Sequence, residues 1–166
     1  MDPRVDPPYV ADELPMLRSW LTWQRQTLAV KCDGLDAEQL RSRSVPPAKL
    51  SLLGLVRHMA DVERNWFRRT YEQSDAPPLH YSAENEDGDF DDVDTADVDE
   101  AFATWQAEIA HADALVDARP DLDATGVRRG AEVSLRWILV HMIEEYARHN
   151  GHADLLRERI DGATGD

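Results

Sequence analysis

Apolar residues recur at spacings of three and four along most of the chain, which is the period of a helix with one buried face. The clearest stripe lies in residues 134–160 and consists of Leu135, Ile138, Leu139, Met142, Tyr146, Ala153 and Leu156. Ser134 is a good N-cap residue, and Gly162 follows the last apolar position. The pattern therefore predicts one long helix at the end of the chain.

Three earlier stripes predict three more helices. The first begins near Asp12 and ends before Gly34, the second runs from Ser51 to about Gln73, and the third covers residues 97–118. A short helical turn is expected at residues 36–40, and Pro46-Pro47 excludes regular structure nearby. Residues 121–133 contain two glycines and predict a turn region or a short hairpin. No convincing strand is expected elsewhere.

The connection between the second and third helices is long and acidic. Ten carboxylates and no basic residue fall between Glu84 and Glu100. Helix connections in bundles usually take about 2–8 residues, so this segment is typical of a crossover in a four-helix bundle. Its Asp87-Gly88-Asp89 pattern lacks the spacing of a calcium loop, which leaves a solvated acidic loop as the expectation. The sequence predicts an all-α four-helix bundle in a single domain, residues 1–166.

Composition narrows the classes of partner and compartment. The net charge of −15 argues against nucleic acids and anionic membrane surfaces as partners. No apolar run approaches the roughly 18 residues of a membrane span, and the N-terminus has no signal-peptide pattern. The single Cys32 is compatible with a reducing compartment, so we expect a cytoplasmic protein. Of the five tryptophans, Trp23 lies off its stripe and is the candidate for the surface of a homodimer.

Several polar residues interrupt the stripe of the last helix. Glu145 and His149 are four residues apart, so their side chains point the same way. Titratable groups on an apolar face need partners, because burying them unpaired is costly. His58, within the apolar face of the second helix, supplies a third possible ligand. Two imidazoles and one carboxylate suit catalytic zinc and also ferrous iron.

Other interpretations of these residues remain open. His58 alone is typical of a satisfied core histidine, and Glu145 with His149 could form a buried pair with arginine or tyrosine and bind no metal. A set made of His141, Glu145 and His149 would span about 12 Å of helical rise, too far for one ion. We therefore place His141 and His152 beside the ligands, where each could orient a ligand or act as a base near neutral pH.

Two segments resemble the DinB-like superfamily, and within it the subgroup called mini-circle proteins. They are LGLVRHMADVERNWF at residues 53–67 and HMIEEYARHNGHADLLRERIDG at residues 141–162. The resemblance covers nearly the whole chain and implies a bundle of up-down-down-up topology, with the crossover between helices two and three. It also implies a divalent metal held by one histidine on the second helix, matched by His58, and by a pair on the fourth. Of that pair His149 matches, but Glu145 stands where most members have histidine.

This departure makes the chain similar to mycothiol-dependent members, including maleylpyruvate isomerase-like enzymes, which use two histidines and one glutamate on zinc. The resemblance implies a zinc-dependent thiol S-transferase or isomerase with mycothiol as cosubstrate. Fe²⁺ and Ni²⁺ are the alternative metals. The alternative function is a non-catalytic, metal-binding stress-response bundle, and a third is a bundle without metal.

The remaining site assignments belong to the transferase hypothesis. His152 or His141 would accept a proton from the thiol. Arg57, Arg64 or Arg148, which lie near the ligands in sequence, would hold a carboxylate of the small-molecule substrate by bidentate contact.

Overall fold

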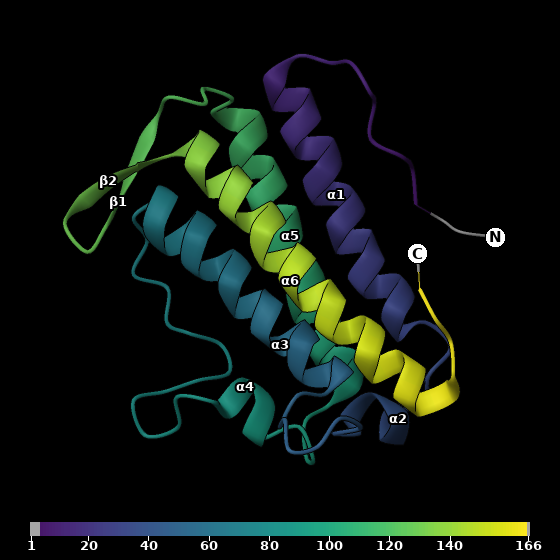
Figure 1. Cartoon of the computed structure of the whole chain (residues 1–166). Coiled ribbons are helices and arrows are strands. Elements are labelled where there is room, and N and C mark those ends of the chain that lie inside the picture. Colours follow the sequence, from purple (N-terminus) through teal and green to yellow (C-terminus); the bar gives the residue numbers. More distant parts are fainter. Residues whose placement is uncertain (1–3, 166) are drawn as a thin grey trace.

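The structure is a computed structural model, and it describes residues 4–165. The chain is mostly helical with one small hairpin (Figure 1). In chain order its elements are α1 (Glu13–Cys32), α2 (Ala37–Arg41), α3 (Leu52–Glu63), η1 (Arg64–Tyr71), α4 (Gly88–Asp91), α5 (Val98–Ala118), β1 (Thr125–Arg128), β2 (Ala131–Ser134) and α6 (Leu135–Asp161). The helices expected from the apolar stripes are confirmed, as is the short hairpin.

The long helical segments lie alongside one another (Figure 1). Helix α6 packs along α1 and also contacts α3, and α3 in turn packs on α5. The stripes seen in the sequence line these contacts, and the largest fully buried side chains include Leu28, Leu55, Trp105 and Leu139. Hydrophobic burial along the stripes therefore brings α3 and α6 together, and these are the two helices that carry the candidate ligands.

Side-chain caps begin several helices where the sequence predicts them. Ser51, Asp97 and Ser134 each accept a hydrogen bond from the backbone N–H three residues later. Asp36 forms a complete capping box at the start of α2. Asp12 occupies the N-cap position of α1 but its side chain makes no cap hydrogen bond. The caps satisfy N–H groups that a helix leaves without partners in its first turn.

Helix α3 continues without a break into η1, which is a π-helical segment. The sequence predicts a single regular helix here, and its end near Gln73 is confirmed to within two residues. The apolar stripe gives no sign of the π-helical turn, because a pattern of buried positions does not specify which carbonyl each N–H reaches. Such segments occur often at functional sites.

The acidic connection is more ordered than a solvated loop. It forms the short helix α4, which packs on α3. Val93 is fully buried and only 6 % of Asp89 is exposed. The guanidinium of Arg57 donates to the backbone carbonyls of Gly88 and Asp89, at 2.9 and 3.0 Å. The expectation of a fully solvated loop is therefore wrong for this part, because buried polar groups of α3 need partners and the connection supplies them.

A network of buried polar groups joins α1, α3, α5 and α6, and we call it the core ion network. Arg25 donates from two nitrogens to the two carboxylate oxygens of Glu63, both at 2.8 Å. The hydroxyl of Tyr146 donates to Glu63 at 2.8 Å and accepts from the indole N–H of Trp105 at 2.8 Å. Burial lowers the pKa of Arg25, but the charge of Glu63, its hydrogen bonds and the charges of Tyr146 and Asp113 together outweigh this effect, so the pKa is raised. In this network the guanidinium of Arg25 and the carboxylate of Glu63 are both hydrogen-bonded.

The tryptophan chosen from the sequence for a dimer surface is not the most exposed one. Trp23 is half-buried beneath the guanidinium of Arg4, at 4.7 Å from its ring centroid. Trp20 and Trp137 are more exposed, at 42 % and 49 %. A surface that joins two copies of the chain stays a prediction. Cys32 is buried, and burial raises the pKa of its thiol to about 12, which makes it a poor nucleophile.

Within the part of the chain that the structure describes, no helix is both long enough and apolar enough to cross a membrane.

Candidate metal centre

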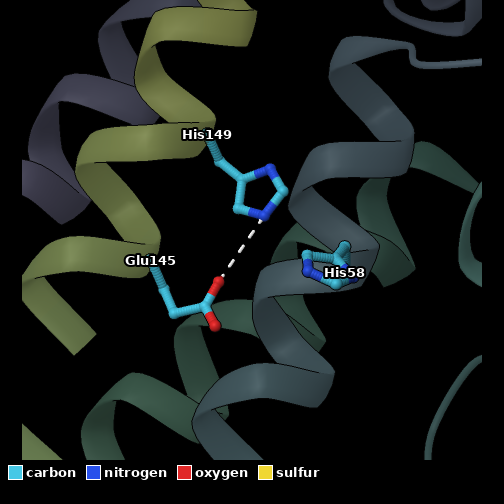
Figure 2. A group of neighbouring side chains, drawn as sticks. All are labelled: His58, Glu145 and His149. Carbon is cyan, nitrogen blue, oxygen red and sulfur yellow. Dashed lines mark ion pairs between the residues drawn. The ribbon is translucent and has the colours of Figure 1, made fainter. Parts of the chain in front are cut away.

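His58, Glu145 and His149 converge between α3 and α6, and we call this set the candidate metal centre. Figure 2 shows Glu145 and His149 pointing from α6 toward His58 on α3. One possible ligand atom from each residue lies within 4.8 Å of those of the other two. The carboxylate of Glu145 is 3.7 Å from Nε2 of His149, and the two imidazole rings are 4.7 Å apart between centroids. The tertiary packing of α3 on α6 thus brings together the three residues singled out in the sequence.

The cluster is partly withdrawn from water. The exposed fractions of the side chains are 27 % for His58, 20 % for Glu145 and 12 % for His149. The pKa of His149 is lowered to about 3, because burial disfavours its charged form and positive charge on His58 and His152 would repel it. This histidine is therefore neutral at physiological pH, which leaves a nitrogen lone pair available for a cation.

The donor set fits a divalent metal. Zinc binds imidazole nitrogen and carboxylate oxygen at about 2.0–2.2 Å, so neighbouring ligand atoms in a tetrahedral shell are about 3.4 Å apart. The separations within 4.8 Å at His58, Glu145 and His149 are of the same order as that value. Three protein ligands leave at least one position for water or a thiol, which is the usual arrangement of catalytic rather than structural zinc.

Asp89 is the residue that sequence reasoning missed. Its carboxylate lies 2.7 Å from Nδ1 of His58, and only 8 % of its side chain is exposed. A carboxylate at Nδ1 favours the tautomer that carries its proton there, which leaves the lone pair on Nε2, the nitrogen that would hold a metal. Asp89 comes from the acidic connection, 31 positions after His58. No local pattern distinguishes it from the other carboxylates of that segment.

The two remaining histidines of α6 lie beside the candidate ligands. Nε2 of His141 is 3.1 Å from the carboxylate of Glu145, and its Nδ1 is 3.5 Å from Glu144. Nδ1 of His152 is 3.4 Å from Nδ1 of His149. His141, Glu144 and Glu145 also form a second close group with metal-binding donors. Glu145 is shared by both groups, whereas His141 is not grouped with His149.

His141 lies between two tryptophans. Its ring is stacked on Trp137 at 4.8 Å and meets Trp66 edge-on at 4.6 Å, both between centroids. These contacts fix the plane of the imidazole, so its nitrogens stay directed at the two glutamates. His141 is therefore placed to orient the Glu145 carboxylate.

The arginines chosen from the sequence bind groups of the protein itself. Arg57 holds backbone carbonyls of the acidic connection, Arg64 pairs with Glu108 at 2.8 Å, and Arg148 pairs with Glu144 at 2.6 Å. Their role toward a substrate stays a prediction. Among the described residues, Glu145 has no arginine partner, so the buried glutamate–arginine pair that would make a metal unnecessary is not formed here.

Comparison with known families gives one match. The model of the mycothiol-S-transferase family matches residues 16–162, a span that includes every residue of the candidate metal centre as well as Asp89. Searches of curated proteins and of solved structures gave no significant match. Because the family model covers most of the chain, the chain belongs to the mycothiol-S-transferase family within the DinB-like proteins.

Proposed function

We propose that the chain is a metal-dependent S-transferase that uses mycothiol, with His58, Glu145 and His149 as the metal ligands. Zinc is the proposed metal, with Fe²⁺ and Ni²⁺ as alternatives. The observation that carries the proposal is the convergence of two imidazoles and one carboxylate from two helices in a half-buried site. The family match supports the thiol cosubstrate.

The proposal includes the arrangement of the whole chain. We infer that α1, α3 with η1, α5 and α6 form a single DinB-like domain, a four-helix bundle of up-down-down-up order. The long acidic connection would be the crossover between its second and third helices. The packing of α6 on both α1 and α3 supports this arrangement.

A zinc ion at this site would lower the pKa of a bound thiol and so raise its thiolate fraction at neutral pH. Asp89 keeps His58 in the tautomer that offers Nε2. His152 is the better placed of the two candidate bases, because both ring nitrogens of His141 already face carboxylates. In the transfer, the thiol proton goes to His152 and sulfur forms a bond to the electrophilic carbon. The bond from that carbon to the leaving group breaks, and the leaving group takes the electron pair.

Metal content and turnover test the proposal together. We expect one equivalent of divalent metal in the wild-type protein and less than a tenth of it in His58→Ala and Glu145→Ala. The control is His111→Ala, which removes a histidine that pairs with Glu72 on the surface. Retained stoichiometric metal in both ligand variants would overturn the site. Bound metal without conjugation of mycothiol to any of a panel of electrophiles would leave the non-catalytic stress-response bundle as the function.

A further inference from the structure

An open groove of about 610 Å³ lies between η1, the segment after it and the turn of the hairpin. Its lining is mostly polar and includes Arg69, Arg128 and Arg129 together with Tyr81. Asp75 also lines it and supplies a carboxylate. We call this feature the arginine groove. A cluster of positive charge is unusual in a chain whose net charge is −15, so its charges need an explanation.

The three guanidinium groups have no acidic partner in the part of the chain that the structure describes. Across residues 4–165, neither Arg69, Arg128 nor Arg129 forms an ion pair with a carboxylate. Arg69 donates to the hydroxyl of Tyr81 at 3.2 Å, and Arg129 is exposed. The pKa of Arg128 is lowered by burial first and then by the charges of Arg129 and Arg69. A bound anion would offset the effect of these neighbouring charges on Arg128.

The frame of the groove is held tightly. A Cβ atom on Gly126 would lie 2.1 Å from the carbonyl oxygen of Thr70, so glycine lets the hairpin backbone pack directly on η1. The side-chain amide of Gln73 donates to the carbonyl of Val127 at 2.9 Å and ties the two edges together. Gln73 and Arg129 both adopt positive φ, at 62° and 51°, which costs energy for residues other than glycine. These contacts hold the groove in shape, and the two positive φ values lower the stability of the fold.

A short series of contacts joins the groove to the candidate metal centre. The guanidinium of Arg128 lies over the ring of Trp66 at 4.2 Å. Trp66 meets His141 at 4.6 Å, and His141 lies 3.1 Å from the carboxylate of Glu145. The groove and the candidate ligands thus lie at the two ends of one packed series of side chains, with Trp66 buried between them.

We propose that the arginine groove binds a carboxylate of the electrophilic substrate, so that the substrates of this chain are organic acids. This assignment rests on the proposed S-transferase function, because only that function makes the bound acid a substrate. The planar fork of a guanidinium matches a carboxylate in bidentate contact, and two or three such groups face one groove. Trp137, which is 49 % exposed and stacked on His141, supplies an apolar surface for the carbon skeleton between the acid and the reactive carbon.

Binding of an unreactive probe pair tests the groove alone. Titration calorimetry compares 4-methylbenzoate with 4-methylbenzamide, which differ in charge but little in shape. We expect the wild-type protein to prefer the benzoate, and the double variant Arg69→Gln/Arg129→Gln to bind it about tenfold more weakly. Arg18→Gln/Arg159→Gln removes the same charge elsewhere and is expected to bind like wild type. Unchanged binding in the groove variant, or tighter binding of inorganic phosphate than of the benzoate, would overturn the assignment.

Turnover of a reactive pair tests the link to transfer. Mycothiol displaces chloride from 4-(chloromethyl)benzoate or its amide: the C–S bond forms, the C–Cl bond breaks, chloride leaves with the electron pair, and the thiol proton goes to His152 and from there to buffer. In Arg69→Gln/Arg129→Gln we expect kcat/KM for the acid to fall about tenfold through KM, with the amide unchanged. Equal losses for acid and amide would overturn the proposal. If neither compound is turned over while benzoate binding still depends on the arginines, the S-transferase function fails and the carboxylate site stands.

Discussion

The core ion network and the candidate metal centre both place a glutamate among polar side chains between helices, yet they differ in how completely that glutamate is satisfied. Both carboxylate oxygens of Glu63 receive hydrogen bonds at 2.8 Å, from Arg25 and Tyr146. Within residues 4–165, the ion pairs of Glu145 are with two histidines, at 3.1 and 3.7 Å. Glu145 and Tyr146 are neighbours on α6, so a rotation of about 100° along one helix separates the two environments.

This difference suits the two clusters to different roles. A saturated buried network is costly to break, because removing one partner leaves an uncompensated charge. A half-buried cluster of two imidazoles and one carboxylate offers the donor set of a divalent metal and is suited to receive one. The same residue type thus stabilises the fold at position 63 and is proposed to serve the site at position 145.

Breaking the core ion network should give the largest effect. Glu63→Gln leaves the buried guanidinium of Arg25 without its main counter-charge, and we expect a loss of about 3–5 kcal/mol in the free energy of unfolding. Urea denaturation followed by circular dichroism measures it. The control Glu72→Gln removes a partly exposed pair with His111 and should change stability by less than about 1 kcal/mol. Equal stability of both variants would show that the network does not hold the fold.

Removing the partner of a candidate ligand should weaken metal binding without unfolding the chain. Asp89→Asn takes the charged acceptor from Nδ1 of His58, and we expect metal affinity to fall about 10–100-fold. Competition with a chelator of known affinity measures it. Asp91→Asn in the same short helix, where the wild-type carboxylate pairs with Lys49 on the surface, is expected to keep wild-type affinity. An unchanged affinity in Asp89→Asn would remove Asp89 from the site.

Acid should act on the candidate metal centre in the metal-free protein. The pKa of His149 is about 3 in the folded chain and about 6.5 when unfolded. As the pH falls, His149 takes up its proton in the unfolded chain before it does so in the folded one. Its contribution to the free energy of unfolding is therefore fully present above about pH 6.5 and declines as the pH falls toward 3, by roughly 1–3 kcal/mol. Denaturation of metal-free protein at pH 7.5 and pH 5 measures the decline, and His149→Ala should show a smaller one. A decline of the same size in the variant would contradict this origin.

The smallest effect is expected for Glu145→Gln in the metal-free protein. Its carboxylate is 20 % exposed and has no fixed counter-charge, so we expect stability to change by less than about 1 kcal/mol. With metal added, the wild-type melting temperature should rise and that of the variant should not, because a ligand stabilises only the state that binds it. Differential scanning calorimetry with and without zinc separates these cases. A strong loss of stability in metal-free Glu145→Gln would show that Glu145, like Glu63, stabilises the fold.

Much of the fold follows from local patterns. The stripes and caps predict the long helices, because burial of one face and satisfaction of the first-turn N–H groups both act within a few residues. Ser134 and the apolar positions after it predict α6 and also place Glu145 and His149 on the same side of it. The hairpin at residues 125–134 was expected only as one of two possibilities, since two glycines mark a turn without specifying which residues pair.

The tertiary structure decided the rest. Three findings depend on how separate segments pack: His58 faces Glu145, Asp89 returns to His58, and Trp20 is more exposed than Trp23. The arginine groove joins residues from η1 and the hairpin that lie more than fifty positions apart, as in the bond from Gln73 to Val127. The sequence by itself determined the helices and the placement of Glu145 and His149 on the same side of α6, because periodicity and spacing are local. The partners across the bundle came only with the packing of α3, α6 and the acidic connection, which no local pattern encodes.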